Sequence, residues 1–452
     1  MIEKLQTLDL KKDSTDDSMN IPDQTIKIKP QNVSNSYEPD APWRLRYWAI
    51  FAGQGSSLIG SALTQFVLLW WITDTTNDIS ALASAGIAAL LPQAIFGPLG
   101  GAFADRYSRR AIMILTDTIS AGCMILLIVL FLTGSVQLWQ VYLMMAVRSA
   151  MQAFQSPAAT ASTAMLVPIS FLPRAAGLNQ TLTGLMTVAA APLGALAISA
   201  MPVGFALSID VVTALLGIVP LLIYEIPQAK EISEKPAGLW GEFKQGVQFV
   251  WNSPGLRRMY GLLAAVVLVI MPSFTLVPLL VKEHFGGGAG QVAMIEGIGG
   301  AGMIAGGIVI AAIAPRKFSV WILSGFSVSC FALALTALVP GDYLPVAIVF
   351  WVISSVAFIM GNSPLMTAIQ TIVPNHMQGR VLSLLTTVTA LAAPFGIALA
   401  APLGKFIGVR WLFVVMGILG GMVSLLGFLS PAILNIHRAK FAPFQQKNSI
   451  DS

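Results

Sequence analysis

The chain of 452 residues is 56% hydrophobic and only 10% charged, with a mean hydropathy of +0.76. A soluble domain carries about 25% charged residues, so this composition excludes a soluble globular protein and indicates one that crosses a membrane many times. The net charge of +5 does not indicate nucleic-acid binding, because basic residues are expected on the cytoplasmic loops of membrane proteins.

The N-terminal stretch, residues 1–42, is rich in Asp, Ser, Asn, Lys and Pro and contains no apolar run. Such a segment cannot bury enough apolar surface to order itself, and it lacks the apolar core of a signal peptide. We therefore expect a disordered cytoplasmic tail, with a regulatory segment as the alternative. A second cytoplasmic tail is expected at residues 435–452.

Apolar segments of about 20 residues follow, the length at which a helix crosses a bilayer. Cys123 and Cys330 lie within two of them, so no disulfide framework is expected. The sequence predicts an all-α integral membrane protein with twelve transmembrane helices. Their approximate bounds are 47–72, 79–104, 111–132, 138–158, 180–201, 203–224, 259–281, 290–313, 318–339, 344–367, 381–403 and 410–434.

The Lys and Arg residues predict the direction of each helix, because cytoplasmic loops carry an excess of both. Of the 26 Lys and Arg residues, only Lys282, Lys405 and Arg410 fall on predicted outer loops, and Arg148 lies within a predicted helix. The remaining 22 fall on one side. We therefore expect a multi-pass protein of the inner (plasma) membrane with cytoplasmic N- and C-termini.

Residues 225–258 form the longest predicted inner loop and separate the chain into two halves. Apolar residues recur at helical spacing within it, which is typical of an amphipathic helix on the membrane surface. A helix that binds a calmodulin-like partner is the alternative. The apolar positions are Trp240, Phe243, Val247, Val250 and Trp251.

The two halves, residues 43–224 and 259–434, carry similar short motifs in the same order. This internal repeat predicts two pseudo-symmetric bundles of six helices, with a substrate site between them near the membrane midplane. The first half contains Ser156-Pro157, Val167-Pro168, Arg174 and Ala190-Ala191-Pro192-Leu193-Gly194, and the second contains Ser363-Pro364, Val373-Pro374, Arg380 and Ala392-Ala393-Pro394-Phe395-Gly396.

Ionisable side chains inside a membrane are costly and therefore need a partner or a function. Four lie within predicted helices: Asp117, Arg148, Asp210 and Glu296. Asp117 and Arg148 lie on consecutive antiparallel helices at heights that differ by roughly 5 Å, so a salt bridge between them is feasible. Such a pair either holds the N-terminal half together or takes part in proton coupling.

Asp210 and Glu296 both lie about two helical turns from the outer ends of their helices. A carboxyl group near apolar walls at this depth can take up a proton from outside and release it to the cytoplasm when the protein changes shape. Each is thus a candidate proton carrier. The alternative for each is a hydrogen bond to Ser or Thr that holds two helices together.

Several amides lie in or at the ends of predicted helices, where a wide cavity for amphipathic ligands would use them beside aromatic and Met side chains. Hydrogen bonding between helices is the alternative role. Gln54, Gln152 and Asn362 are the leading cavity candidates. The full set is Gln54, Gln65, Gln93, Gln152, Gln155, Asn179, Asn362 and Gln370.

Gly297 to Gly302 match the dinucleotide-binding pattern by letter, but they lie in an apolar helix with no preceding strand, so close helix packing explains them better. The sequence has no phosphate-binding P-loop, no cluster of metal ligands and no hydrolase nucleophile motif. We therefore expect no cofactor, no metal, no nucleic-acid partner and no enzymatic activity.

The predicted loop after the second helix resembles the loop between helices 2 and 3 of the major facilitator superfamily, whose pattern is Gly-x-Leu-Ala-Asp-Arg-x-Gly-Arg-Lys/Arg. Phe103 replaces the Leu and Ser108 replaces the second Gly. The matching residues are Gly101, Ala104, Asp105, Arg106, Arg109 and Arg110.

Stretches spread over residues 44–430 resemble the macrolide-efflux branch of this superfamily, a group of bacterial multidrug exporters. They are Ala52-Gly53-Gln54 with Ser57-Leu58-Ile59, Arg148-Ser149 with Phe154 and Pro157, and Gln370-Thr371-Ile372-Val373-Pro374 with Gly379-Arg380-Val381. The resemblance implies drug:proton antiport by alternating access. It also implies that Asp105 meets the start of helix eleven, near Gly379 and Arg380, and latches the inner side shut, since a helix N-terminus attracts a carboxylate.

The resemblance further implies that helices three, six, nine and twelve are peripheral, which favours Glu296 in helix eight over Asp210 in helix six as the proton carrier. The antiporter pattern of helix five, Gly-Pro-x-x-Gly-Gly, is kept only in part, as Ala191-Pro192-Leu193-Gly194-Ala195. The proline that kinks the helix is present, and two glycines are lost.

We therefore predict a monomeric exporter that moves amphipathic, macrolide-like drugs out of the cell against protons. One alternative is an exporter of an endogenous metabolite such as a siderophore, which would share the same membrane architecture. Another is a non-transporting membrane sensor, which would need no ionisable groups facing a cavity.

Overall fold

A computed structural model describes residues 42–226, 239–315 and 317–434, all within one compact unit, Pro39–Ser452. The two predicted cytoplasmic tails, apart from Pro42, lie outside the described residues, as do residues 227–238 of the predicted linker. Every regular element among the described residues is helical.

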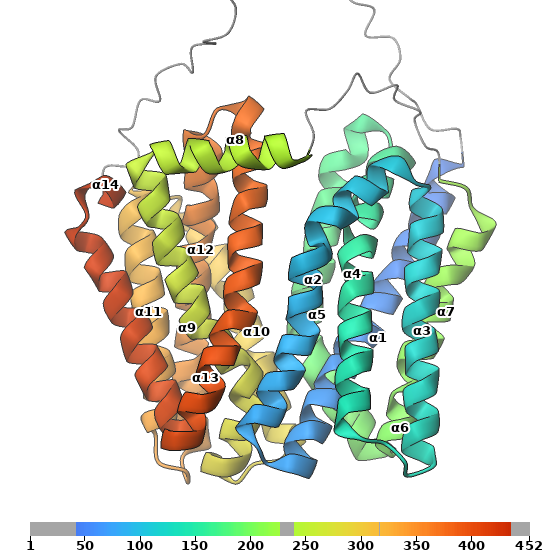
Figure 1. The fold of residues 1–452 in the computed structure, drawn as a ribbon, viewed down its shortest axis with the longest axis horizontal. Coiled ribbons are helices and arrows are strands. Elements are labelled where there is room, and N and C mark those ends of the chain that lie inside the picture. Colours follow the sequence, from blue (N-terminus) through green and yellow to red (C-terminus); the bar gives the residue numbers. More distant parts are fainter. Residues whose placement is uncertain (1–41, 227–238, 316, 435–452) are drawn as a thin grey trace, which may run out of the picture. The chain divides into compact units, whose positions relative to one another are not determined.

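The helices follow one another with short connections (Figure 1). Their bounds are α1 (Trp43–Thr76), α2 (Ile79–Arg106), α3 (Arg109–Leu132), α4 (Leu138–Leu166), α5 (Leu172–Ala200), α6 (Val203–Ala206), α7 (Ser208–Ile223), α8 (Leu239–Asn252), α9 (Pro254–Phe285), α10 (Ala289–Ile313), α11 (Phe318–Leu338), α12 (Leu344–Ile372), α13 (Asn375–Leu426) and α14 (Pro431–Leu434).

The predicted all-α membrane fold class is confirmed, and the helices of the described chain are consistent with twelve membrane crossings. Ten segments of the described chain are long and apolar enough to span a bilayer, with α6 and α7 forming one of them. The last of the ten, Met377–Leu429, makes two crossings because α13 turns at Gly408, where φ is +81°. The twelfth crossing is α4, which has 29 residues and is less apolar because it carries Arg148 and several glutamines.

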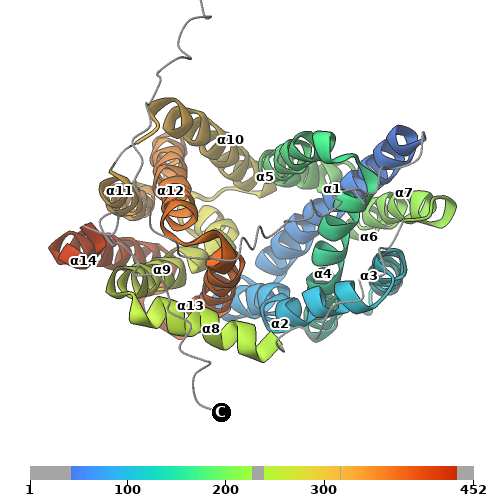
Figure 2. The same cartoon turned by 90° about the horizontal axis from the view of Figure 1, so that it is seen from above.

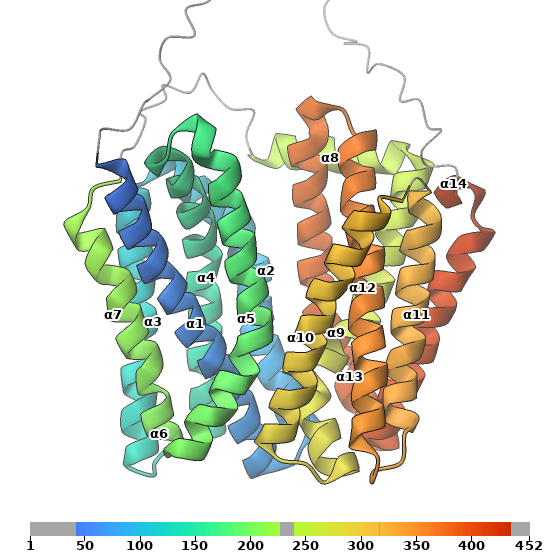
Figure 3. The same cartoon turned by 180° about the vertical axis from the view of Figure 1, so that it is seen from behind.

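The helices form two groups, α1 to α7 and α9 to α14 (Figures 1 and 3). We call them the N-bundle and the C-bundle. Across the boundary, α2 packs against α13 and α5 packs against α10 (Figure 2). The helix α8 lies across one end of the C-bundle, on α9 and α13. We call this end of both bundles the α8 end, and the opposite end, where α1 turns into α2, the far end.

Buried apolar side chains form three clusters, which differ in whether they contain residues of one bundle or of both. The largest contains residues of both bundles, among them Leu68 and Leu82 of the N-bundle with Leu279 and Phe413 of the C-bundle, and it occupies the far end. Apart from Val250 of α8, the buried members of the other two clusters each come from a single bundle, toward the α8 end. The two bundles therefore share a core at the far end and have separate cores at the α8 end.

Candidate functional site

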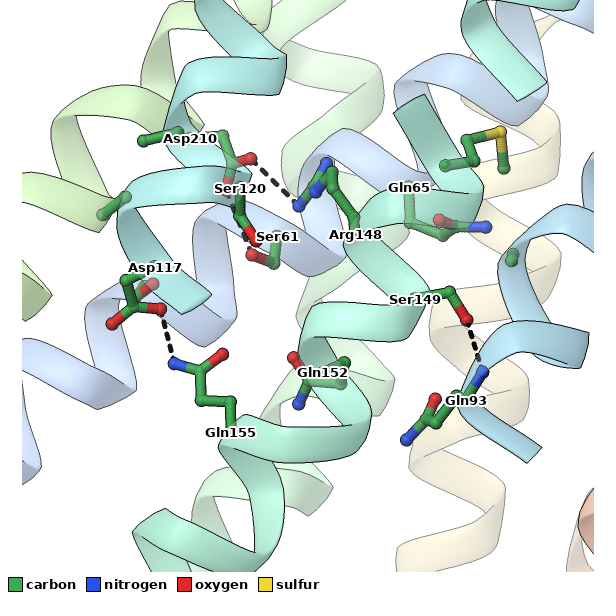
Figure 4. Close-up of a pocket in the computed structure, with 15 residues that line it drawn as sticks. Ser61, Gln65, Gln93, Asp117, Ser120, Arg148, Ser149, Gln152, Gln155 and Asp210 are labelled. Carbon is green, nitrogen blue, oxygen red and sulfur yellow. Dashed lines mark hydrogen bonds and ion pairs between the residues drawn. The ribbon is translucent and has the colours of Figure 1, made fainter. Parts of the chain in front are cut away.

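A polar cavity of about 180 Å³ lies inside the N-bundle, between α1, α2, α3, α4 and α7 (Figure 4). Polar side chains provide most of its lining, which is unusual at membrane depth because each such group must find a partner there. The lining residues are Ser57, Ser61, Gln65, Ala89, Gln93, Asp117, Ser120, Ala121, Met145, Arg148, Ser149, Gln152, Gln155, Asp210 and Ala214.

Helical periodicity places these side chains on the inner faces of their helices. On α1, Ser57, Ser61 and Gln65 recur at spacings of three or four residues, so they share one face. On α4, Arg148 and Gln152 follow the same rule. The polar face of each helix is thus turned away from lipid and toward its neighbours.

An ion pair between Arg148 and Asp210 joins α4 to α7. One guanidinium nitrogen of Arg148 lies 2.9 Å from the Asp210 carboxylate, and the two side chains are only 13% and 5% exposed. Ser61 Oγ donates a hydrogen bond of 3.1 Å to the other Asp210 oxygen. A second Arg148 nitrogen faces Met124 Sδ at 3.5 Å. The pair therefore ties α1, α4 and α7 together (Figure 4), and Met124 adds a contact with α3.

Among the residues that the structure describes, Asp117 is held by two amides and by no cation. Gln54 Nε2 donates to one carboxylate oxygen at 3.0 Å, and Gln155 Nε2 donates to the other. Gln155 also donates to Gln54 Oε1 at 3.1 Å, and Gln54 reaches the carbonyl of Gly217 on α7 at 3.3 Å. Both oxygens of this buried carboxylate are thus supplied with donors, as a buried charge requires.

The predicted salt bridge between Asp117 and Arg148 is therefore wrong, because Asp117 binds two glutamine amides instead. Gln155 lies two helical turns along α4 from Arg148, roughly 10 Å, and it is Gln155 that stands at the height of Asp117. Arg148 meets Asp210 of α7 instead. The heights of residues on two helices do not determine which side chains meet, because the rotation of each helix about its axis also matters.

Close packing of α1 against α7 brings Ser61 to Asp210. Gly60 has no side chain, and a Cβ at this position would collide with Thr213 and would lie 3.1 Å from Asp210 Cα. Gly53 and Gly217 form a second such contact between the same two helices. Small residues at these positions therefore set the distance at which the hydrogen bond to Asp210 can form.

Glu296 and Asn362 lie in the C-bundle, apart from this cavity. On α10, Glu296 is half-buried and lies on the face opposite the exposed Met294 and Ile298. Within the part of the chain that the structure describes, the Glu296 carboxyl has no hydrogen-bond or ion-pair partner. Asn179 and Gln370 also lie outside the cavity.

The two sides of the predicted latch are not joined in this structure, since Asp105 and Arg380 share no hydrogen bond or ion pair within the described ranges. Asp105 is exposed at the α8 end and has no hydrogen-bond or ion-pair partner among the described residues. Arg109 donates to the carbonyl of Ala161 at 3.0 Å, and Arg110 donates to the carbonyls that end α7, including Leu222 at 2.8 Å. Gly101 and Arg106 are partly or fully exposed beside them.

Arg380, on the other side of the boundary, is engaged by α8. Its Nη1 donates to Gln245 Oε1 at 2.6 Å, and a Cβ at Gly246 would lie 3.0 Å from the Arg380 carbonyl oxygen. The amphipathic helix thus packs on the start of α13. Sequence reasoning did not assign Gln245 this contact.

Sequence reasoning also missed the serines of the cavity, Ser57, Ser61 and Ser120. A single Ser in an apolar helix is unremarkable, because it can bond to its own backbone. The usable signal was periodic: Gln54, Ser57, Ser61 and Gln65 place four polar groups on one stripe of an otherwise apolar helix.

Comparisons with known proteins agree with this architecture. Macrolide efflux protein A from Streptococcus pyogenes is 29% identical over 385 residues, which cover 83% of this chain and 94% of that protein. The multidrug efflux pump Tap from Mycobacterium tuberculosis is 22% identical over 403 residues, or 86% of this chain and 92% of that protein.

Among solved structures, the chain resembles a bacterial homologue of the human lysosomal transporter Spinster in an inward-facing and unoccupied conformation. The TM-score is 0.69 at 16% identity, and the match covers 90% of this chain and 100% of that one. The family profile of the Major Facilitator Superfamily matches residues 50–397, which confirms the predicted resemblance. The chain therefore belongs to the Major Facilitator Superfamily and is a membrane transporter.

Proposed function

We propose that the protein exports amphipathic compounds, macrolides among them, in exchange for protons. Two relatives support the direction and the compound class, since they are named as a macrolide efflux protein and a multidrug efflux pump. The observation that carries the proposal is the N-bundle cavity, in which Asp210 and Asp117 are buried and Arg148 is only 13% exposed at membrane depth. Such groups mark ion or proton pathways in transporters.

Proton exchange at Asp210 would act on the packing of the N-bundle. A proton on Asp210 removes the charge that binds Arg148, and a freed guanidinium must then find another acceptor. The change is transmitted to α1 and α7 because Ser61 and Arg148 bind the same carboxylate. Asp117, bound to Gln54 and Gln155, is a second acid within reach of this rearrangement.

Glu296 is the proposed proton carrier of the C-bundle. It has no partner among the described residues, so a proton can bind or leave without first breaking an ion pair. Its position on the face of α10 turned away from the exposed residues supports access from the boundary between the bundles. The substrate is proposed to bind along this boundary, with Gln152 and Asn362 contributing from the two sides.

The proposed cycle alternates between opening at the α8 end and opening at the far end. The shared core at the far end and the separate cores at the α8 end support an α8-end-open state for this conformation. Closure at the α8 end would bring Asp105 to the start of α13, near Gly379 and Arg380, where a helix N-terminus stabilises a carboxylate. Asp105 is exposed and has no ion-pair partner within the described ranges, so it is available for that contact.

We place the α8 end in the cytoplasm and the protein in the bacterial plasma membrane, as a monomer. The excess of Lys and Arg at the α8 end supports this orientation. The described chain begins at Pro42 and ends at Leu434, both at that end, and both termini are proposed to be cytoplasmic.

The test is drug accumulation in bacteria that lack their own pumps. Cells that express the protein are expected to accumulate less erythromycin and less of a fluorescent dye than cells with the empty vector, and a protonophore should abolish the difference. Glu296→Gln and Asp210→Asn should each remove export while the protein remains in the membrane. Unchanged accumulation across a wide compound panel would contradict the drug-export proposal and would leave an endogenous metabolite or a sensor role.

A separate arm tests the proton carrier alone. If wild-type protein exports drugs and Glu296→Gln exports them equally well with the same protonophore sensitivity, the assignment of Glu296 is wrong although the exporter proposal stands.

A further inference from the structure

Basic side chains are rare at the far end of the bundles. Only Lys282, Lys405 and Arg410 lie there among the described residues, whereas the other described Lys and Arg residues, apart from Arg148, lie at the α8 end. Positive charge on that side runs against the usual distribution in membrane proteins, so each of the three needs a physical reason.

Lys282 reaches from the C-bundle to the end of α1 in the N-bundle. Its ammonium group lies 3.1 Å from the Asp74 carboxylate and donates to the carbonyls of Thr73 at 3.2 Å and Asp74 at 2.9 Å. The three acceptors match the three donors of an ammonium group. Lys282 thus serves as a C-terminal cap for a helix that belongs to the other bundle.

The turn that follows α1 makes two more contacts with the C-bundle. Asn77 adopts the left-handed conformation, with φ at +48°, and its side chain donates to Glu283 at 3.3 Å. Lys405 of α13 lies 3.9 Å from the Asp78 carboxylate, which also caps α2 by accepting from Ser80. The whole α1–α2 turn is therefore bound by side chains of α9 and α13.

Arg410 provides an internal contrast. It donates to the carbonyls of Ala337 at 3.1 Å and Leu338 at 3.4 Å, which end α11 of its own bundle. All three basic residues of the far end thus bind acceptors at helix ends, but only Lys282 and Lys405 join the two bundles.

We propose that Lys282 and Lys405 are positioning residues of the transport cycle, which hold the far end shut by binding the α1–α2 turn and release it when that end opens. The proposal rests on the alternating access proposed above. An exposed ion pair alone contributes little. Here three interactions act on one turn: the ion pair of Lys282 with Asp74, the contact of Lys282 with the C-terminus of α1, and the hydrogen bond from the Asn77 amide. They lie where apolar contacts already join the bundles.

The experiment measures opening of the far end directly. Ile79 is 7% exposed, and its side chain would lie 3.1 Å from a Cβ added at Gly404 across the boundary. In full-length protein with Cys123 and Cys330 replaced, Ile79→Cys reports access from the outside through its rate of labelling by an impermeant maleimide. The variants are Lys282→Asp, Lys405→Asp and the exchange Lys282→Asp/Asp74→Lys, with Arg410→Gln as the matched control.

Lys282→Asp should raise the labelling rate by roughly three- to tenfold, the range expected for loss of one exposed ion pair and one helix C-terminal contact. Lys405→Asp should raise it less, because its ion pair is longer. The charge exchange should return the rate toward that of the parent, and Arg410→Gln should leave it unchanged. If the lysines had only a structural role, their replacement would lower the melting temperature without producing this pattern of labelling rates.

Equal labelling of Lys282→Asp, Lys405→Asp and parent would overturn the proposal, as would an Arg410→Gln effect of the same size. Because labelling needs neither a drug nor a proton gradient, its result is independent of the export assay. Loss of the proposed export function with the expected labelling pattern would leave this role of the two lysines intact.

Discussion

Arg148 shows how much one side chain at membrane depth depends on its partner. Its guanidinium and the Asp210 carboxylate are both largely shielded, so each charge is tolerated only through the other and through Ser61. Removing one member of such a pair costs more than removing both, because the remaining charge stays buried and unpaired.

Replacement of one member is therefore expected to be worse than replacement of the pair. Arg148→Ala should lower the free energy of unfolding by about 3 kcal/mol, whereas Arg148→Met/Asp210→Leu should recover most of that loss. Thermal unfolding of the purified variants in detergent measures both. Equal destabilisation by the single and the double variant would contradict the buried-pair interpretation.

Much of this site could be predicted from the sequence, but its pairing could not. Arg148, Asp117, Asp210 and Glu296 stand out because charges are rare in apolar segments. Which of them meet depends on helix rotation and on the close α1–α7 packing permitted by Gly60, and neither follows from hydropathy. The contact of Gln245 with Arg380 was out of reach for the same reason, since it joins segments far apart in the chain.

At the scale of single helices, hydropathy predicted the positions of the long helices but made most of them too short. The first crossing was expected at 47–72, and α1 runs from Trp43 to Thr76. An apolar run reports only the part of a helix that lies in lipid, and the helix continues into water until a cap ends it. The last two crossings are separated only by the turn at Gly408, whose positive φ of +81° suits glycine.

The contact between α1 and α7 gives a test at this scale. Gly60→Ala should force the two helices apart, lengthen the bond from Ser61 to Asp210, and cost about 1–3 kcal/mol as overpacking does. Gly122→Ala is the matched control, because a Cβ at Gly122 of α3 meets nothing within 4 Å. Melting temperatures of the two variants would decide, and equal values would contradict the tight packing at Gly60.

At the scale of the whole transporter, the two bundles can be locked together where they touch. A Cβ at Gly86 of α2 would lie 2.6 Å from Thr275 Cγ2 of α9. The Cβ atoms of cysteines at these positions would therefore lie within about 4 Å, which suits a disulfide. The paired variant bridges the two bundles inside the shared core.

Oxidation of Gly86→Cys/Thr275→Cys, in protein with both native cysteines replaced, should abolish export, and a reductant should restore it. The reason is that opening the far end must separate these two residues. Each single cysteine variant under the same oxidant serves as the control. Full export by the oxidised, cross-linked protein would contradict a cycle in which the bundles part at this end.

The shared apolar core at the far end has a thermodynamic consequence. In the proposed cycle the bundles separate there, so side chains such as Leu82, Leu279 and Phe413 would be hydrated, and hydration of apolar surface raises the heat capacity. The balance between the two states should then follow a curved van 't Hoff plot, with the enthalpy of opening increasing on warming. Labelling of Ile79→Cys measured over a series of temperatures would reveal that curvature, whereas a purely polar seal would yield a nearly straight line.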